Sequence, residues 1–347
     1  MIEGFYGNTK VRETLDLMIS QKRIAQTILL CGPEGVGKAT LARRFAATLL
    51  GQAAKIEHDD LSLQANLDVI ADREKWTSEK RAEDPLLFST HPDFVTFAPD
   101  GPLRQITIQQ MRLLRQRAQL KPLRGAYRVF LIDHLDRANE QSANSLLKVL
   151  EEPPEHLVIV ATAENVYDLL PTIRSRSLIL SLARLSDEEM RAFAKARALP
   201  DAETRVALAE GSPGLAVTLD LDLYRERRAL ILAALECGAG ITPFSSWVQQ
   251  SESFTSRKSE KLDLYLKLAY GVLEDILAVS QGRGAIRNRD VQKQIEAISE
   301  RVTFTWLECA VQYFDELVQM IRRNIQKTLA LDALVMNLRN PVADKRT

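Results

Sequence analysis

Residues 32–40, Gly-Pro-Glu-Gly-Val-Gly-Lys-Ala-Thr, have the glycine and lysine spacing of a phosphate-binding P-loop. That motif is a glycine, four residues, then Gly-Lys followed by serine or threonine. Gly32, Gly35, Gly37 and Lys38 fit it. Glycines let backbone N–H groups curl around a phosphate, and the amino terminus of the following helix favours an anion. We therefore expect Lys38 to reach the β- and γ-phosphates of a bound nucleotide.

One position of the motif differs, because Ala39 stands where a serine or threonine hydroxyl would bind Mg²⁺. Thr40 is one residue further along, and one helical step turns a side chain away by about 100°. A glycine-rich turn without a ligand is the alternative. The apolar run 27–31 before the loop and the apolar positions at helical spacing after it favour a P-loop. The loop can hold a nucleotide but lacks a part needed for hydrolysis.

The elements around the loop alternate between strands and helices. Apolar runs predict strands at 27–31, 94–97 and 178–180, and the near-continuous runs at 128–132 and 157–161 predict buried strands. Helices are predicted over 106–120 and around the apolar stripe formed by Ala143, Leu146, Leu147 and Leu150. This alternation predicts an α/β domain with a doubly wound parallel sheet.

Polar residues at the ends of two predicted strands extend the candidate site. Asp133 follows the run 128–132, where P-loop proteins place the acidic residue that holds Mg²⁺; a helix cap is the alternative. The next residue in hydrolysing proteins of this class is usually a glutamate that orients the attacking water, and here it is His134. Thr162 ends the next strand, where it would contact a γ-phosphate or water, or else be a buried threonine that bonds to the backbone. The missing hydroxyl and glutamate together argue against hydrolysis.

Composition bounds the remaining classes of protein. A length of 347 residues and 46% hydrophobic content suggest two or three domains with substantial cores. Lys+Arg and Asp+Glu both number 46, so the net charge is zero. The chain as a whole therefore lacks the positive charge that would indicate nucleic-acid binding. The three cysteines, Cys31, Cys237 and Cys309, are too far apart for a disulfide framework or a metal pair. Without a signal-peptide pattern or an apolar run of roughly 18 residues, we expect a cytoplasmic protein.

Strand patterns stop after about residue 184. Ser186 and the acidic residues after it predict a helix start, and the segment 211–214, Gly-Ser-Pro-Gly, breaks the helical pattern. From about 226 to 340 the chain is amphipathic and helical throughout, with polar breaks. Within the first part, residues 52–90 are polar and charged with no clear period, which indicates a surface insertion. The predicted parts are 1–184, 185–225 and 226–347.

Three segments of the chain resemble the clamp-loader branch of the AAA+ proteins. They are the P-loop, the string Asn-Ser-Leu-Leu-Lys-Val-Leu-Glu-Glu-Pro-Pro at 144–154, which is highly specific to that branch, and Ile-Arg-Ser-Arg-Ser at 173–177. The resemblance implies an AAA+ domain at 1–184, a helical lid at 185–225 and a helical collar at 226–347. It also implies that Arg176 is an arginine finger that enters the ATP site of a neighbouring subunit. A surface arginine is the alternative.

Within that branch the chain resembles the delta-prime subfamily of bacterial DNA polymerase III clamp loaders. Ala39, His134 and Gly214 replace groups that the hydrolysing tau/gamma proteins use, and Gly214 stands where those proteins carry an arginine. The segments 90–93 and 324–334 are also typical of delta-prime sequences. The resemblance implies a stator whose own site is silent or holds ATP or ADP without turnover. A self-sufficient tau/gamma-type ATPase is the alternative.

The resemblance also implies partners. They are the tau/gamma and delta subunits, the sliding clamp indirectly, and primer-template DNA bound without sequence preference. Basic residues around one predicted helix would contact DNA phosphates or simply face solvent: Arg112, Arg115, Arg117, Lys121 and Arg124. The family commonly carries a four-cysteine zinc module where residues 52–90 lie. This segment has no cysteine, and His58 alone cannot hold zinc, so we predict no metal there.

Overall fold

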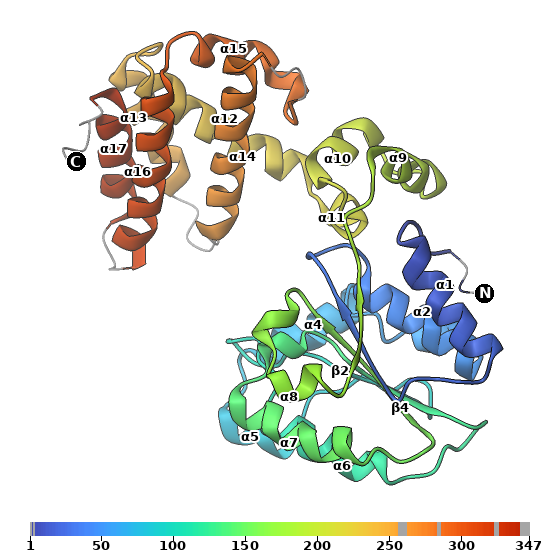
Figure 1. Cartoon of the computed structure of the whole chain (residues 1–347). Helices are drawn as coiled ribbons and strands as arrows, with labels where there is room; N and C mark the ends of the chain where they lie inside the picture. The colour runs from blue at the N-terminus through green and yellow to red at the C-terminus, as the bar shows by residue number, and fades with distance from the viewer. Residues whose placement is uncertain (1, 3, 256–261, 283–285, 323–325, 341–347) are drawn as a thin grey trace. The chain divides into compact units, whose positions relative to one another are not determined.

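The computed structural model describes residues 2, 4–255, 262–282, 286–322 and 326–340 (Figure 1). They fall into two compact units, one formed by residues up to 199 together with 209–217, the other by 200–208 together with residues from 218 onward. Asn324 and Ile325, which begin the C-terminal string noted above, lie outside the described residues.

A five-stranded, all-parallel sheet organises the first unit in the order β2-β3-β4-β1-β5. The strands are β1 Thr27–Cys31, β2 Phe94–Phe97, β3 Arg128–Ile132, β4 Leu157–Ala163 and β5 Leu178–Ser181. The α/β prediction is confirmed, and β4 runs two residues further than expected. The first four of these strands are buried throughout, as parallel strands covered on both faces must be. Strand β5 is an edge strand that pairs only with β1 and is largely exposed.

Helices cover both faces of this sheet (Figure 1). They are α1 Thr9–Ser20, α2 Lys38–Leu50, α6 Ile108–Ala118, α7 Glu140–Glu151 and α8 Pro171–Arg174. Each face has its own buried hydrophobic cluster. Leu114 of α6 and Leu146 of α7 belong to one cluster, and Leu15 of α1 and Phe45 of α2 belong to the other. The sheet is therefore doubly wound, and its loops at the carboxyl ends of the strands are free to carry a site.

The insertion at 52–90 is an ordered structure of short helices, α3 Ala53–Glu57, α4 Gln64–Arg73 and α5 Ser78–Glu83. Its few apolar residues anchor it: Ile56 is buried with the core beside α2, and Ile70 is buried with Leu86. Arg73 is buried and forms an ion pair with Asp100 at 2.8 Å. No helical period is visible in these residues because the helices are short and most of their side chains are exposed.

Helices α9 Asp187–Ala196, α10 Ala202–Ala209 and α11 Pro213–Thr218 follow β5. Ser186 caps α9 as predicted, in a capping box with Glu189. Residues 209–217, which include the start of α11, belong to the first unit, while 200–208 belong to the second. The residues that we expected to form a lid, 185–225, are therefore shared between the two units.

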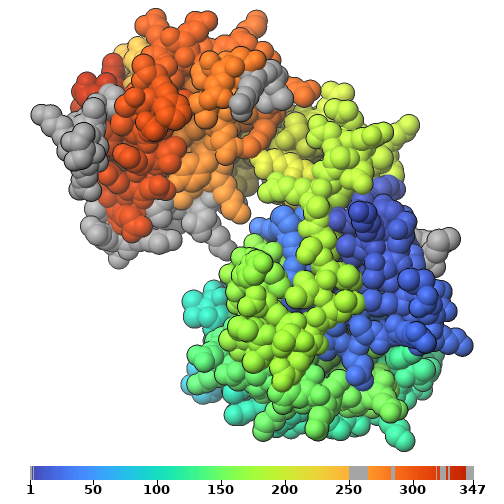
Figure 2. All heavy atoms as spheres, in the orientation of Figure 1, coloured from blue at the N-terminus to red at the C-terminus, as the bar shows by residue number. Residues whose placement is uncertain are grey.

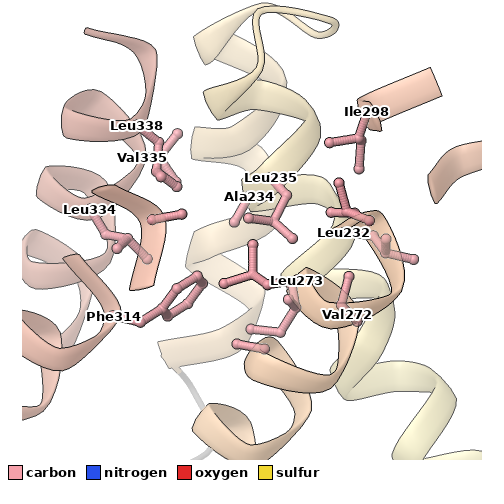
Figure 3. Packing of buried hydrophobic residues seen from close by; sticks show 14 of the residues in the cluster. Leu232, Ala234, Leu235, Val272, Leu273, Ile298, Phe314, Leu334, Val335 and Leu338 are labelled. Atoms are coloured by element: carbon pink, nitrogen blue, oxygen red, sulfur yellow. The ribbon is translucent and has the colours of Figure 1, made fainter. Parts of the chain in front are cut away.

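The second unit consists of helices among its described residues. Besides most of α10, they are α12 Leu221–Gly238, α13 Phe244–Thr255, α14 Leu262–Ser280, α15 Gln292–Ser299, α16 Phe304–Arg322 and α17 Lys327–Arg339, with a short 3-10 turn, η3, at Arg289–Val291. Leu235, Leu273, Phe314 and Leu334 meet in their common core (Figure 3). At Gly238 an added Cβ would lie 2.6 Å from Leu338 Cβ, so α12 and α17 approach too closely there for a side chain. In the described part of the chain, none of the helices is long and apolar enough to cross a bilayer.

Candidate functional site

The P-loop joins the end of β1 to the start of α2 and has the backbone that its glycines predict. Gly32, Gly35 and Gly37 have φ angles of 146°, 77° and 97°, a region that other residues rarely adopt. A Cβ at Gly32 would also lie 2.2 Å from the carbonyl oxygen of Leu182. Gly37 is the N-cap of α2, so the loop leads its backbone directly into a helix amino terminus. This is the arrangement that binds phosphate.

Lys38 is folded back onto this loop. Its Nζ donates hydrogen bonds to the carbonyl oxygens of Gly32 and Pro33 at 2.6 and 2.8 Å, and the residue is only 6% exposed. Burial lowers the pKa of Lys38, while the nearby carboxylates of Glu164 and Asp133 act in the opposite direction. The ammonium group of Lys38 is therefore desolvated and bonded to carbonyl oxygens of the loop. Phosphate oxygens of a nucleotide could replace these carbonyl oxygens as its partners.

Asp133 and Thr162 meet at the carboxyl ends of β3 and β4. The Thr162 hydroxyl donates to Asp133 Oδ1 at 2.6 Å and accepts the His134 backbone N–H at 2.8 Å. Thr162 is fully buried and Asp133 nearly so. Thr162 thus bonds both to the side chain of Asp133 and to the backbone of His134. Asp133 is not the cap of the following 3-10 turn, η1 Leu135–Arg137, because His134 occupies that position.

His134 has a left-handed backbone, with φ of 55°, which is uncommon for a residue other than glycine. Its Nδ1 lies 4.0 Å from Asp136 Oδ1, and both of these buried atoms lack a hydrogen-bond partner among the described residues. One ligand atom from each of His134, Asp136 and Glu164 lies within 4.8 Å of the others. No sequence pattern indicated Asp136 or Glu164, because their approach depends on the pairing of β3 with β4. Carboxylates therefore lie beside the position at which hydrolysing proteins carry a glutamate.

Helix α11 begins directly against the P-loop. Ser212 Oγ donates to the Glu34 carbonyl oxygen, and the Gly214 N–H donates to the Gly35 carbonyl oxygen, both at 2.8 Å. A Cβ at Gly214 would lie 3.0 Å from that same oxygen of Gly35. An arginine at residue 214 would therefore require α11 to move away from the loop. Gly214 allows this helix to pack closely on the loop, and it has no side chain that could reach a phosphate.

Arg176 lies in the turn between α8 and the edge strand β5, in the stretch of chain after β4 that reaches the surface of the first unit (Figure 2). Pro171 starts α8 at its first position, as predicted. Arg176 Nη1 donates to the Thr172 carbonyl oxygen and Nη2 pairs with Glu151, both at 3.1 Å, and 36% of its side chain is exposed. Among the described residues, the polar contacts of the Arg176 guanidinium are with Glu151, Thr172 and Ser175, and none is with the P-loop.

The predicted basic cluster lies on α6 and the loop after it. Arg117 is half-buried and the other four, Arg112, Arg115, Lys121 and Arg124, are exposed. The buried Asp93 holds this loop by accepting the N–H groups of Leu123 and Arg124, each at 2.7 Å. Four of the five cations are therefore exposed, on α6 and on the loop that Asp93 holds.

Comparison with known proteins agrees with this geometry. The family model described as "DNA polymerase III, delta subunit" matches residues 7–186, more than half of the chain. The DNA polymerase III subunit delta' of Pseudomonas aeruginosa is 32% identical over 221 residues, which are 61% of this chain and 61% of that protein. The tau subunit of Escherichia coli is 29% identical over 185 residues, 53% of this chain and 26% of the relative.

The matched region thus spans less than two thirds of the length of each of these relatives. Among solved structures, a DNA polymerase III gamma subunit-related protein from Thermotoga maritima aligns with 94% of this chain and 98% of its own, at 18% identity and a TM-score of 0.44. The P-loop, the strand-end acid and the extent of the family match lead to one assignment: the chain belongs to the DNA polymerase III delta-subunit family, among the clamp-loader proteins.

Proposed function

We propose that the chain is a delta-prime-type subunit of a DNA polymerase III clamp loader, a stator that supplies Arg176 to the ATP site of a neighbouring subunit. In this proposal its own P-loop is silent or holds ATP or ADP without turnover. The ring that it joins loads a sliding clamp onto primed DNA. Family membership supports the clamp-loader assignment, and the geometry of the P-loop supports a site without turnover.

The observation that carries the proposal is a complete phosphate cradle without its hydrolytic groups. The glycine conformations and Lys38 are those of a nucleotide site. Residue 39 is alanine, so no side chain there can bind Mg²⁺. His134 stands at the water-orienting position, and its backbone is fixed by Thr162. Hydrolysis needs both Mg²⁺ and an oriented water, and this chain lacks the residue-39 hydroxyl for the first and the glutamate at residue 134 for the second.

Arg176 suits a role in a neighbour's site because it lies in a partly exposed turn beside an edge strand. A guanidinium placed on the developing charge of a transferring phosphoryl group accelerates hydrolysis by roughly 10³–10⁵ in GTPases. Its fixed, planar set of donors suits phosphate oxygens better than a lysine ammonium does. We propose that this contact is made in trans, across a subunit interface.

The alternative is an active tau/gamma-type ATPase. Gamma and tau subunits are among the relatives, and Asp136 and Glu164 provide carboxylates beside His134. Under this reading one of these carboxylates would orient the water. The two readings differ in a single measurement, because the alternative predicts ATP turnover by the purified chain alone.

Other parts of the proposal concern partners and surroundings. We propose that residues 226–347 form a collar that packs with the tau/gamma and delta subunits, and that 185–225 act as a lid. The exposed cations of α6 would contact the backbone of primer-template DNA without reading its sequence. The ordered insertion at 52–90 takes the place of a zinc module without a metal, and the protein works in the cytoplasm.

The test is reconstitution with tau/gamma and delta subunits, sliding clamp and primer-template DNA. Arg176→Ala is compared with Arg23→Ala, a change at an exposed arginine between α1 and β1. We expect Arg176→Ala to lower DNA-stimulated ATP hydrolysis strongly while the complex still assembles, and Arg23→Ala to leave it unchanged. Turnover of several per second by the isolated wild-type chain would favour the ATPase alternative and contradict the stator.

A further inference from the structure

We propose that Glu151 is a positioning residue for Arg176, holding its guanidinium ready before the neighbouring subunit docks; this inference rests on the proposed function of Arg176. Glu151 belongs to the Leu-Glu-Glu-Pro-Pro string and Arg176 to the Arg-Ser-Arg-Ser segment, which the sequence shows only as separate motifs. The structure joins them through one ion pair, from Arg176 Nη2 to Glu151 Oε1 at 3.1 Å.

Arg176 needs such a contact because its local surroundings fix it poorly. The turn after α8 is short, and the other contacts of its guanidinium are with Thr172 and Ser175, within four residues of it. A free arginine side chain loses up to about 2 kcal/mol of rotamer entropy when it is fixed. A contact from another element removes part of that freedom in advance, so less is lost when the guanidinium meets phosphate.

Glu151 is itself held in place, as a positioning residue must be. It is the last residue of α7, whose buried residues Leu146, Val149 and Leu150 pack against the sheet. The chain just after it is also fixed, because Gln26 Nε2 donates to the carbonyl oxygens of both Pro153 and Pro154, at 3.3 and 3.2 Å. The end of α7 is therefore tied to the sheet on both sides of Glu151.

The geometry leaves the guanidinium with donors to spare. Arginine carries five N–H donors, and the contacts with Glu151, Thr172 and Ser175 use only part of this set. The remaining donors are available for phosphate oxygens while the carboxylate stays bound. In this arrangement Glu151 orients the catalytic group and does not touch the nucleotide.

The next residue provides a matched control. Glu152 is also exposed and also at the end of α7, and no hydrogen bond or ion pair of its side chain is seen in the described structure. Glu151→Gln and Glu152→Gln each remove one charge from the same turn. Only the first removes the negative charge that pairs with Arg176.

The experiment measures ATP hydrolysis by the complete complex with clamp and primer-template DNA. Both partners of the pair are partly exposed, 36% for Arg176 and 50% for Glu151, and such pairs contribute less than a fully buried one. We expect Glu151→Gln to lower kcat about two- to five-fold. The KM for ATP and the affinity of assembly should not change, and Glu152→Gln should match the wild type.

Two results would overturn the inference. One is a wild-type kcat for Glu151→Gln. The other is a fall in the single-turnover rate when Glu151→Gln is added to Arg176→Ala that equals the fall caused by Glu151→Gln in the wild type. A residue that acts through Arg176 has no effect once Arg176 is gone. A separate outcome identifies failure of the proposed function: if Arg176→Ala alone keeps the wild-type rate, Arg176 is no finger and Glu151 has nothing to position.

Discussion

Removing the charge of Asp100 should release the insertion at 52–90 from the first unit. Asp100 Oδ1 and Oδ2 accept from Arg73 Nε and Nη2 at 3.1 and 2.8 Å, and the two side chains are only 1% and 5% exposed. Losing one partner of a buried pair typically costs about 3–5 kcal/mol, because the other charge stays buried. Arg73 keeps a contact to Asp84, so we expect the lower end of that range for Asp100→Asn.

Hydrogen exchange of the α4 amides measures this effect locally, without assuming that the two units unfold together. A loss of about 3 kcal/mol corresponds to exchange more than a hundredfold faster. Asp84→Asn is the control, because the Asp84 side chain is 70% exposed and such pairs contribute at most about 1 kcal/mol. If Asp100→Asn changed exchange no more than Asp84→Asn, the buried pair would not be what holds the insertion.

Two further predictions concern the strand ends and the second unit. Thr162→Val removes the partner of Asp133 Oδ1 and of the His134 N–H, so we expect a loss of about 1–3 kcal/mol in the unfolding free energy of the first unit, seen as a lower urea midpoint; Thr162→Ser should restore it. The pKa of Asp290 in the folded protein is lowered by its hydrogen bond from Arg228. The ionised carboxylate therefore stabilises the fold above the ordinary carboxyl pKa, and this contribution is lost as the pH falls through the lower pKa of the folded state. Wild type should therefore lose more stability than Asp290→Asn below about pH 4 in acid titrations followed by circular dichroism; equal losses would contradict this.

Local patterns predicted the framework of the first unit. The strand at 128–132 and the P-loop followed from runs of residue types, and the cap at Ser186 followed from the residues next to it. These features depend on neighbours in sequence, which a single chain displays. Once the strands were predicted, Asp133 and Thr162 could be expected at strand ends, and the two side chains are in contact there.

The rest of the site depends on contacts between distant segments. The insertion at 52–90 is ordered by Ile70 and by Arg73, whose partner Asp100 lies outside the insertion. The packing of α11 on the P-loop joins residues far apart in sequence, and no motif predicts a hydrogen bond from Gly214 to the loop. The ion pair at Arg176 likewise depends on where α7 ends, which packing decides.

The central claim is that this chain acts on ATP through a neighbour and not through its own P-loop. The most direct measurement is DNA-stimulated ATP hydrolysis by the complex that contains Arg176→Ala, with assembly followed in parallel by gel filtration. The account predicts a large fall in rate with assembly intact, limited by the share of turnover that passes through the site served by Arg176. A wild-type rate in the assembled mutant complex would contradict it.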